Sequence, residues 1–159
     1  MAVMHRTLLA TCAGVVMVAG TGAVNAGAGM VAPKADLAHH GRASLSQGRL
    51  AVSVETESRG PAKLENATVR LDFSVPLAGA GELSPSCLWS GDTTVLCATG
   101  PLRAGAAGRR TVIDLRADGT PDELVMTVRT HWNGGAVDPE PGNNEHEVLV
   151  TATGAAYVF

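Results

Sequence analysis

Hydrophobic and polar positions alternate with a period of two along several short stretches of the chain. Over residues 49–55, Leu50, Val52 and Val54 occupy every second position between small or polar neighbours. Over residues 67–75, aliphatic and phenylalanine side chains are separated by threonine, arginine, aspartate and serine. A period of two places alternate side chains on opposite faces of a strand, so both stretches predict β-strands with one buried face.

Weaker or shorter alternation predicts the other strands, and turn residues separate them. The expected strands lie at 110–116, 123–132 and 147–151, with less distinct ones at 35–39 and 95–97. No window of eleven or more residues repeats apolar positions at helical spacing without an intervening glycine or proline. The pattern therefore predicts an all-β fold, an immunoglobulin-like antiparallel β-sandwich of about seven strands that follows a cleavable signal peptide.

Residues 1–26 have the layout of a secretory signal peptide. An apolar run follows Arg6, and Val24-Asn25-Ala26 fits a cleavage site. A transmembrane anchor would need about 20 apolar residues, and glycines interrupt this run earlier. A lipoprotein signal at Cys12 is a weaker alternative, because this cysteine lies in the middle of the apolar run.

Removal of that segment sets the expected domain organisation and location. A flexible linker is predicted over residues 27–35 and one folded domain over residues 36–159. Residues 154–159 are too short to span a membrane and carry no sorting signal. We expect the mature protein to be secreted to the extracellular space, either freely or in association with the cell surface.

The two cysteines of the mature chain predict a disulfide. Cys87 and Cys97 flank the turn signal Ser90-Gly91-Asp92, an arrangement that suits a bridge across a hairpin. A closed loop of this length contributes about 2–3 kcal/mol in the chain-entropy model. The alternative is a redox-active pair, but the chain has no Cys-x-x-Cys motif and no basic residue beside either thiol.

Composition narrows the class of function. The chain has 12 lysines and arginines against 15 aspartates and glutamates, a formal net charge of −3. This charge, without a basic stripe, excludes the electrostatic footprint of a nucleic-acid-binding protein. Aromatic residues make up only 3% of the chain, which a sandwich core of aliphatic side chains tolerates. Trp132 is in phase with the apolar residues of the 123–132 strand and, like Trp89, is expected to anchor the core or its rim.

The order of three turn motifs around the cysteines resembles a known family. The segments are 57–62 (ESRGPA), 100–105 (GPLRAG) and 138–144 (DPEPGNN). In this order they resemble the bacterial extracellular immunoglobulin-like repeats of the DUF11/CARDB type, over most of residues 36–152. The chain differs in having Ser58 where asparagine is usual and in being a single copy. The resemblance implies a cell-surface or secreted spacer, adhesion or interaction module, and it supplies no catalytic residues.

The turn residues themselves have a structural explanation. Gly60 followed by Pro61 combines a permissive backbone with a fixed φ, and Gly105 closes the second motif. We therefore expect Gly60, Pro61 and Gly105 to redirect the chain rather than to contact a ligand.

Two groups of residues are candidates for metal binding. The turn at Asp138, Glu140, Asn143 and Asn144 offers the oxygen ligands that calcium prefers, but it lacks the spacing of a calcium loop, and two prolines stiffen it. A plain acidic turn is the favoured interpretation. The histidines lack the three or four convergent ligands of a zinc or copper site. We expect exposed or edge positions for the four in the mature chain, His39, His40, His131 and His146.

The sequence thus favours binding over catalysis. It lacks Gly-x-Ser-x-Gly, His-Glu-x-x-His and a glycine-rich phosphate loop, so we expect no enzyme activity and no cofactor. The expected function is that of a non-enzymatic interaction or structural module, of the adhesion or spacer type. Its partner would be an extracellular protein or a cell-wall polymer, bound at an exposed sheet edge or at the end loops. Alternatives are a secreted protein that binds calcium, copper or a small ligand, and a small secreted hydrolase.

Overall fold

The regular secondary structure of the described part of the chain is almost entirely β-strand. The computed structural model describes residues 31–78 and 83–159, so the predicted signal peptide lies outside the described residues. No helix in these two ranges is long and apolar enough to cross a membrane. The strands are β1 (Ala35–Ser46), β2 (Arg49–Pro61), β3 (Thr68–Phe73), β4 (Cys87–Trp89), β5 (Thr94–Ala98), β6 (Arg109–Arg116), β7 (Glu123–Trp132), β8 (Glu145–Thr151) and β9 (Tyr157–Val158), with a single 3-10 turn, η1 (Pro141–Asn144).

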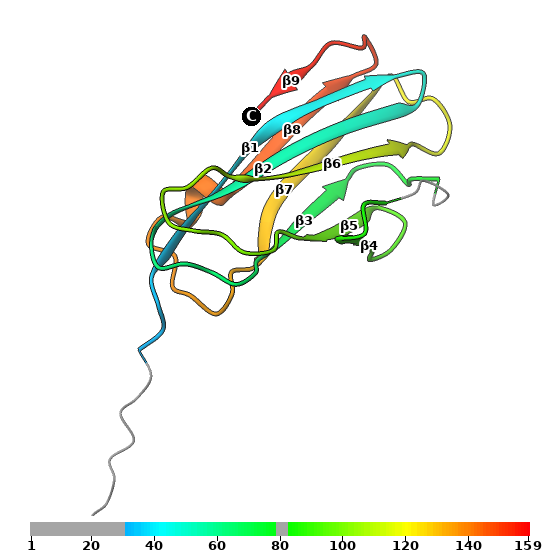
Figure 1. Cartoon of the computed structure of the whole chain (residues 1–159). Coiled ribbons are helices and arrows are strands. Elements are labelled where there is room, and N and C mark those ends of the chain that lie inside the picture. The colour runs from blue at the N-terminus through cyan, green and yellow to red at the C-terminus, as the bar shows by residue number, and fades with distance from the viewer. Residues whose placement is uncertain (1–30, 79–82) are drawn as a thin grey trace, which may run out of the picture. The chain divides into compact units, whose positions relative to one another are not determined.

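Two antiparallel sheets form a sandwich (Figure 1). One has the strand order β6-β2-β1-β9 and the other has the order β4-β5-β3-β7-β8. This distribution, with β1, β2 and β6 facing β3, β7 and β8, is the connectivity of an immunoglobulin-like sandwich, and the predicted fold class is confirmed. The described residues contain nine strands instead of about seven. The additional ones, β4 and β9, are three and two residues long, too short to show alternation.

The predicted alternation generates the core. Leu50, Val52 and Val54 of β2 point inward, as do Leu124 and Met126 of β7. Each fully buried aliphatic side chain contributes about 1.5–3 kcal/mol relative to an exposed one. The largest side chains buried to this extent are Leu37, Leu45, Leu50, Val52, Leu71, Val95, Leu102, Leu124, Met126, Val128 and Val150.

Trp132 does not share the buried face of β7, contrary to the phase of the sequence. Its side chain is 48% exposed. The pairing of β7 with β3 shifts register at this end, because Thr68 pairs with Trp132 while Val69 pairs with Thr130. The extra residue in β7 breaks the alternation. Trp89, in contrast, packs against the core from the rim.

His39 is buried, so its expected exposed or edge position is wrong. Its ring lies on the inward face of β1, 3% exposed, between two hydrophobic clusters. Nδ1 is 3.0 Å from Oγ1 of Thr56 in the same sheet, and Nε2 is 2.9 Å from Oγ1 of Thr130 in the opposite sheet. The ring therefore forms a polar link across the sandwich. The neighbouring His40 is exposed, as expected.

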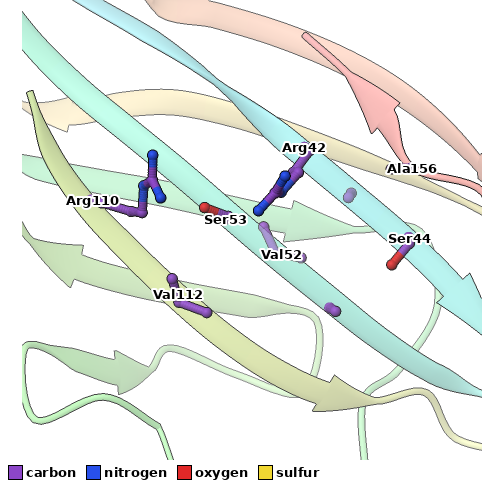
Figure 2. A pocket seen from close by; sticks show the side chains of 9 residues that line it. Arg42, Ser44, Val52, Ser53, Arg110, Val112 and Ala156 are labelled. Carbon is purple, nitrogen blue, oxygen red and sulfur yellow. The ribbon is translucent and has the colours of Figure 1, made fainter.

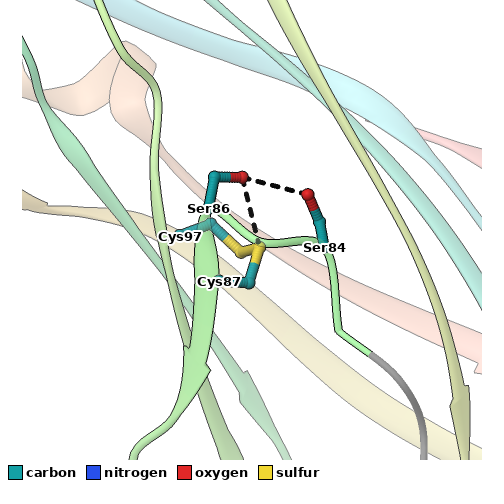
Figure 3. Close-up of a disulfide and its surroundings, with 4 residues drawn as sticks. All are labelled: Ser84, Ser86, Cys87 and Cys97. Carbon is teal, nitrogen blue, oxygen red and sulfur yellow. Dashed lines mark hydrogen bonds between the residues drawn. A yellow bond between two sulfur atoms is a disulfide. The ribbon is translucent and has the colours of Figure 1, made fainter.

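The predicted disulfide is present between Cys87 and Cys97, with an S–S distance of 2.06 Å (Figure 3). The two residues face each other directly in the β4–β5 pair. The hydroxyls of Ser84 and Ser86 lie beside the bridge, 3.1 Å from one another. The bridge fastens a three-residue strand, which has few ladder hydrogen bonds of its own, to the edge of the larger sheet.

Candidate functional site

Four arginines gather on the outward face of the sheet that contains β1, β2 and β6. Pairing of β2 with both neighbours brings Arg116 beside Arg49, and places Ser53 between Val112 and Arg42. Because alternate residues share a face, this register aligns the outward residues of three strands in one surface. We call it the arginine face, and its members are Arg42, Ser44, Arg49, Ala51, Ser53, Glu55, Arg110, Val112, Asp114 and Arg116.

A hollow of about 300 Å³ lies on the arginine face. Figure 2 shows Arg42 and Arg110 on either side of it, with Ser53 between them. The small side chains of Ser44 and Ala51 face each other across β1 and β2 and leave space that larger residues would fill. Two similar hollows adjoin this one, toward His40 and toward Arg116.

The arginine face is positively charged although the chain as a whole is acidic. Its four arginines stand against two carboxylates, those of Glu55 and Asp114, while the whole chain has a formal charge of −3. The Nη2 atom of Arg110 lies 3.3 Å from Oε2 of Glu55, and that of Arg49 lies 3.5 Å from Oδ1 of Asp114. Both arginines are exposed, and of the two carboxylates Asp114 is exposed and Glu55 half-buried, so each pair contributes at most about 1 kcal/mol and can exchange for other partners.

The other two arginines of this face have no such contact. Within residues 31–78 and 83–159, no carboxylate oxygen lies within 4.0 Å of the guanidinium of Arg42 or Arg116. A guanidinium presents a planar fork of donors that matches carboxylate and phosphate groups. The arginine face therefore has the chemistry to bind an anionic group.

On the outer face of the other sheet, the arginines are paired with a carboxylate. On β3, Nε of Arg70 donates to Oδ2 of Asp72 at 2.7 Å, and Arg129 approaches the same carboxylate at 3.3 Å. Thr94 also donates its hydroxyl to Asp72 at 2.8 Å. The hydrogen bond from Arg70, assisted by Thr94, lowers the pKa of Asp72. Both of these arginines are therefore paired with a carboxylate of their own sheet, unlike Arg42 and Arg116 of the arginine face.

The acidic turn holds β1 in place. Oδ2 of Asp138 accepts hydrogen bonds from the backbone N–H of Leu37 at 3.0 Å and from Nδ2 of Asn144 at 2.7 Å. Oδ1 accepts from the N–H of Glu140 at 2.9 Å. The amide of Asn143 donates to Asp36 at 2.9 Å. The structure thus gathers Asp138 and Asn144, whereas only the backbone of Glu140 joins them.

The contacts within this turn are those of a structural clamp. Three N–H donors already occupy the carboxylate that would lead a calcium site. In the described part of the chain, no group of three or more histidines, cysteines, aspartates and glutamates is arranged to hold a metal ion.

The same turn belongs to a series of contacts that covers the free edge of β1. The odd-numbered residues of β1 point their backbone N–H and C=O groups away from β2. Most of these groups are hydrogen-bonded to other parts of the chain. The hydrogen bonds join Ala35 N–H to Val137 O, Leu37 N–H to Asp138 Oδ2, His39 O to His146 Nε2, Gly41 to Phe159 in both directions, and Gly154 N–H to Leu45 O. Because an open strand edge invites pairing with another chain, this series removes one edge of the sheet from that role.

The three turn residues singled out in the sequence lie close together. Gly60, the residue before the last one of β2, has a φ of +95°, and its bond to Pro61 is cis. Gly105, with a φ of +66°, donates its N–H to the carbonyl of Ser58 at 2.8 Å. A side chain at Gly60 would come within 2.9 Å of Cβ of Ala104. The role of these residues in redirecting the chain stays a prediction.

Sequence reasoning missed the arginine face. Arg49 and Arg110 lie in predicted strands, but a single sequence does not reveal that β2 lies between β1 and β6. The pairing register, which brings the four arginines together, was also hidden. Comparisons with protein-family models and with curated proteins found no match for the chain.

Proposed function

We propose that this protein is a non-enzymatic, secreted interaction module that binds an anionic polymer of the cell surface through the arginine face. The observation that carries the proposal is the clustering of four exposed arginines around small-residue hollows on an otherwise acidic protein. Secretion is inferred from the predicted signal peptide, and the disulfide fits an oxidising compartment. The resemblance to extracellular immunoglobulin-like modules points to the same class.

A polymer suits this surface better than a folded protein partner. Tight protein interfaces depend on large aromatic or aliphatic anchors that enter fitted pockets. The arginine face offers one sizeable apolar side chain, Val112, and shallow hollows floored by serine and alanine. A flexible chain that carries carboxylates or phosphates can place successive charges against successive arginines without such anchors.

A crosslinking pull-down tests the proposal. The mature protein, with its disulfide intact, is incubated with the cell-wall fraction and culture fluid of the source cells, and captured material is identified by mass spectrometry. The decisive comparison is between Arg42→Gln/Arg116→Gln and Lys63→Gln/Arg103→Gln, which remove the same charge on and off the arginine face. Lys63 and Arg103 are both exposed.

The first double variant should bind the captured polymer about tenfold more weakly, since it loses two exposed charge contacts of up to about 1 kcal/mol each. Its binding should also depend less on salt. The control variant should bind like the wild type. Equal losses in both variants, or capture of a neutral species that both retain, would refute the arginine face as the binding surface.

A further inference from the structure

The second edge of this sheet, formed by β6, differs from the edge of β1. On the side that faces β2, the N–H of Ala117 donates to the carbonyl of Gly48 at 2.8 Å. On the opposite side, the carbonyl of Arg116 accepts a hydrogen bond from the N–H of Ala78 at 2.8 Å. In an antiparallel ladder these directions alternate along the strand. The backbone groups of Arg110, Val112 and Asp114 therefore point away from β2.

Among the described residues, these backbone groups have no hydrogen-bond partner. No hydrogen bond from a residue in 31–78 or 83–159 reaches the outward N–H or C=O groups of Arg110, Val112 and Asp114. The Val112 side chain is 59% exposed. The edge of β1 is covered by contacts along most of its length, whereas β6 carries neither a bulge nor a proline that would prevent pairing.

We propose that a second copy of this chain pairs with β6 through its own β6, antiparallel and about a two-fold axis at Val112. This goes beyond the proposed function, because the partner is the protein itself. The two four-stranded sheets would join into one continuous sheet. Val112 would pair with its counterpart, and Arg110 with the partner's Asp114, giving about six backbone hydrogen bonds from three outward pairs.

Charge complementarity favours a second copy in one register, the one that pairs Arg110 with Asp114. With the axis at Val112, each Arg110 stands opposite an Asp114, and two valines meet at the centre. Moving the axis to Arg110 or to Asp114 would place like charges opposite each other, which destabilises a cross-strand pair. An axis midway, at residue 113, would bring Arg110 against Arg116. Of these registers, only the first satisfies every charge between residues 110 and 114.

The existing ion pairs leave room for this arrangement. Arg110 lies 3.3 Å from Glu55 and Asp114 lies 3.5 Å from Arg49, both within the same copy. The side chains are 61% and 58% exposed, respectively, so each can take a second partner across the axis. The joined sheet would carry two arginine faces side by side, which would strengthen binding to a long anionic chain by multivalency.

Sedimentation equilibrium of the disulfide-bonded mature protein, from micromolar to millimolar concentration, tests the proposal. A five-residue edge contact is small, so we expect a reversible monomer–dimer equilibrium in this range. Val112→Pro removes an outward N–H without affecting the ladder to β2, which edge positions tolerate. It should remain folded by circular dichroism and stay monomeric, whereas Val112→Thr should still dimerise.

A charge exchange keeps the test independent of folding. Arg110→Asp makes both charged edge positions acidic, and Asp114→Arg makes both basic, so each variant alone should be monomeric. Mixed in equal amounts, the two should form a heterodimer, because every cross-axis pair is again opposite in charge. A wild type that stays monomeric throughout, a Val112→Pro variant that dimerises unchanged, growth beyond dimers, or a mixture that fails to associate would each overturn the proposal.

Discussion

The buried ring of His39 should make the stability of the sandwich depend on pH in a defined window. Burial, reinforced by the positive potential of His146 and His40 when protonated, lowers the pKa of His39 from 6.5 to about 4; Asp138 opposes this shift. The unfolded chain therefore binds the proton at higher pH than the folded protein does. The contribution of neutral His39 is complete above pH 6.5 and is lost as the pH falls from 6.5 through 4.

The size of the effect follows from the shift. A pKa difference of about 2.5 units corresponds to about 3 kcal/mol, at 1.36 kcal/mol per unit. This is a large fraction of the 5–15 kcal/mol that is typical of a domain. A protonated ring can only donate hydrogen bonds. Its two nitrogens face the hydroxyls of Thr56 and Thr130, which can accept as well as donate, so protonation need not break either hydrogen bond. The main cost is burying the charge.

Urea denaturation between pH 7 and pH 4 measures this dependence. The wild type should lose about 3 kcal/mol more than His39→Gln over that range, even if the variant starts from lower stability at pH 7. His131→Gln, which changes an exposed histidine, should follow the wild type. Asp72, whose pKa is also lowered, loses its contribution on acidification in all three proteins and cancels in the comparison. Parallel curves for wild type and His39→Gln would refute the reasoning.

Two further substitutions test other parts of the fold. Asp138→Ala should lower the free energy of unfolding by about 2–3 kcal/mol, because it leaves the edge N–H of Leu37 unpaired. Calcium should not raise the melting temperature of the wild type, and a rise would support the calcium-binding alternative. Gly41→Ala should cost about 3 kcal/mol by overpacking, since the new methyl would overlap the backbone carbonyl oxygen of Ser53 in β2 and also lie 2.8 Å from the ring of Phe159. Gly142→Ala, where a new Cβ would meet no atom within 4 Å, should be neutral in the same thermal denaturation assay.

The strands that could be predicted are those whose inward positions are filled by ordinary core residues. β2 and β7 alternate in this way; β7 spans its expected range, and β2 begins at the expected residue, Arg49, but continues to Pro61 instead of ending at residue 55. β1 runs from Ala35 to Ser46, well beyond the predicted 35–39. The inward-facing positions of β1 include His39 and Gly41, which a hydrophobic pattern does not recognise as core residues. Two threonine hydroxyls satisfy the buried ring of His39. At Gly41 the absence of a side chain lets the Ser53 carbonyl and the Phe159 ring approach closely.

The candidate site was less accessible than the fold. The acidic turn is recognisable in sequence, but the hydrogen bond that the N–H of Leu37 donates to Asp138 joins residues 101 positions apart. Alternation shows which arginines face outward without showing which strands are neighbours. The arginine face and the open edge of β6 arise from that pairing, so both required the sheet order.

The covered edge of β1 limits how far association can extend. A sheet with two open edges can add strands at both ends, and such growth leads to fibres. Here side chains and the two-residue β9 cover most of one end, so β6 offers the longer stretch of edge for pairing with a second copy. A strand as short as β9 is itself a poor template for pairing, so growth of the sheet would terminate at two. For a protein expected to work outside the cell, where no chaperone machinery disperses aggregates, this asymmetry would permit a specific pair and prevent a filament.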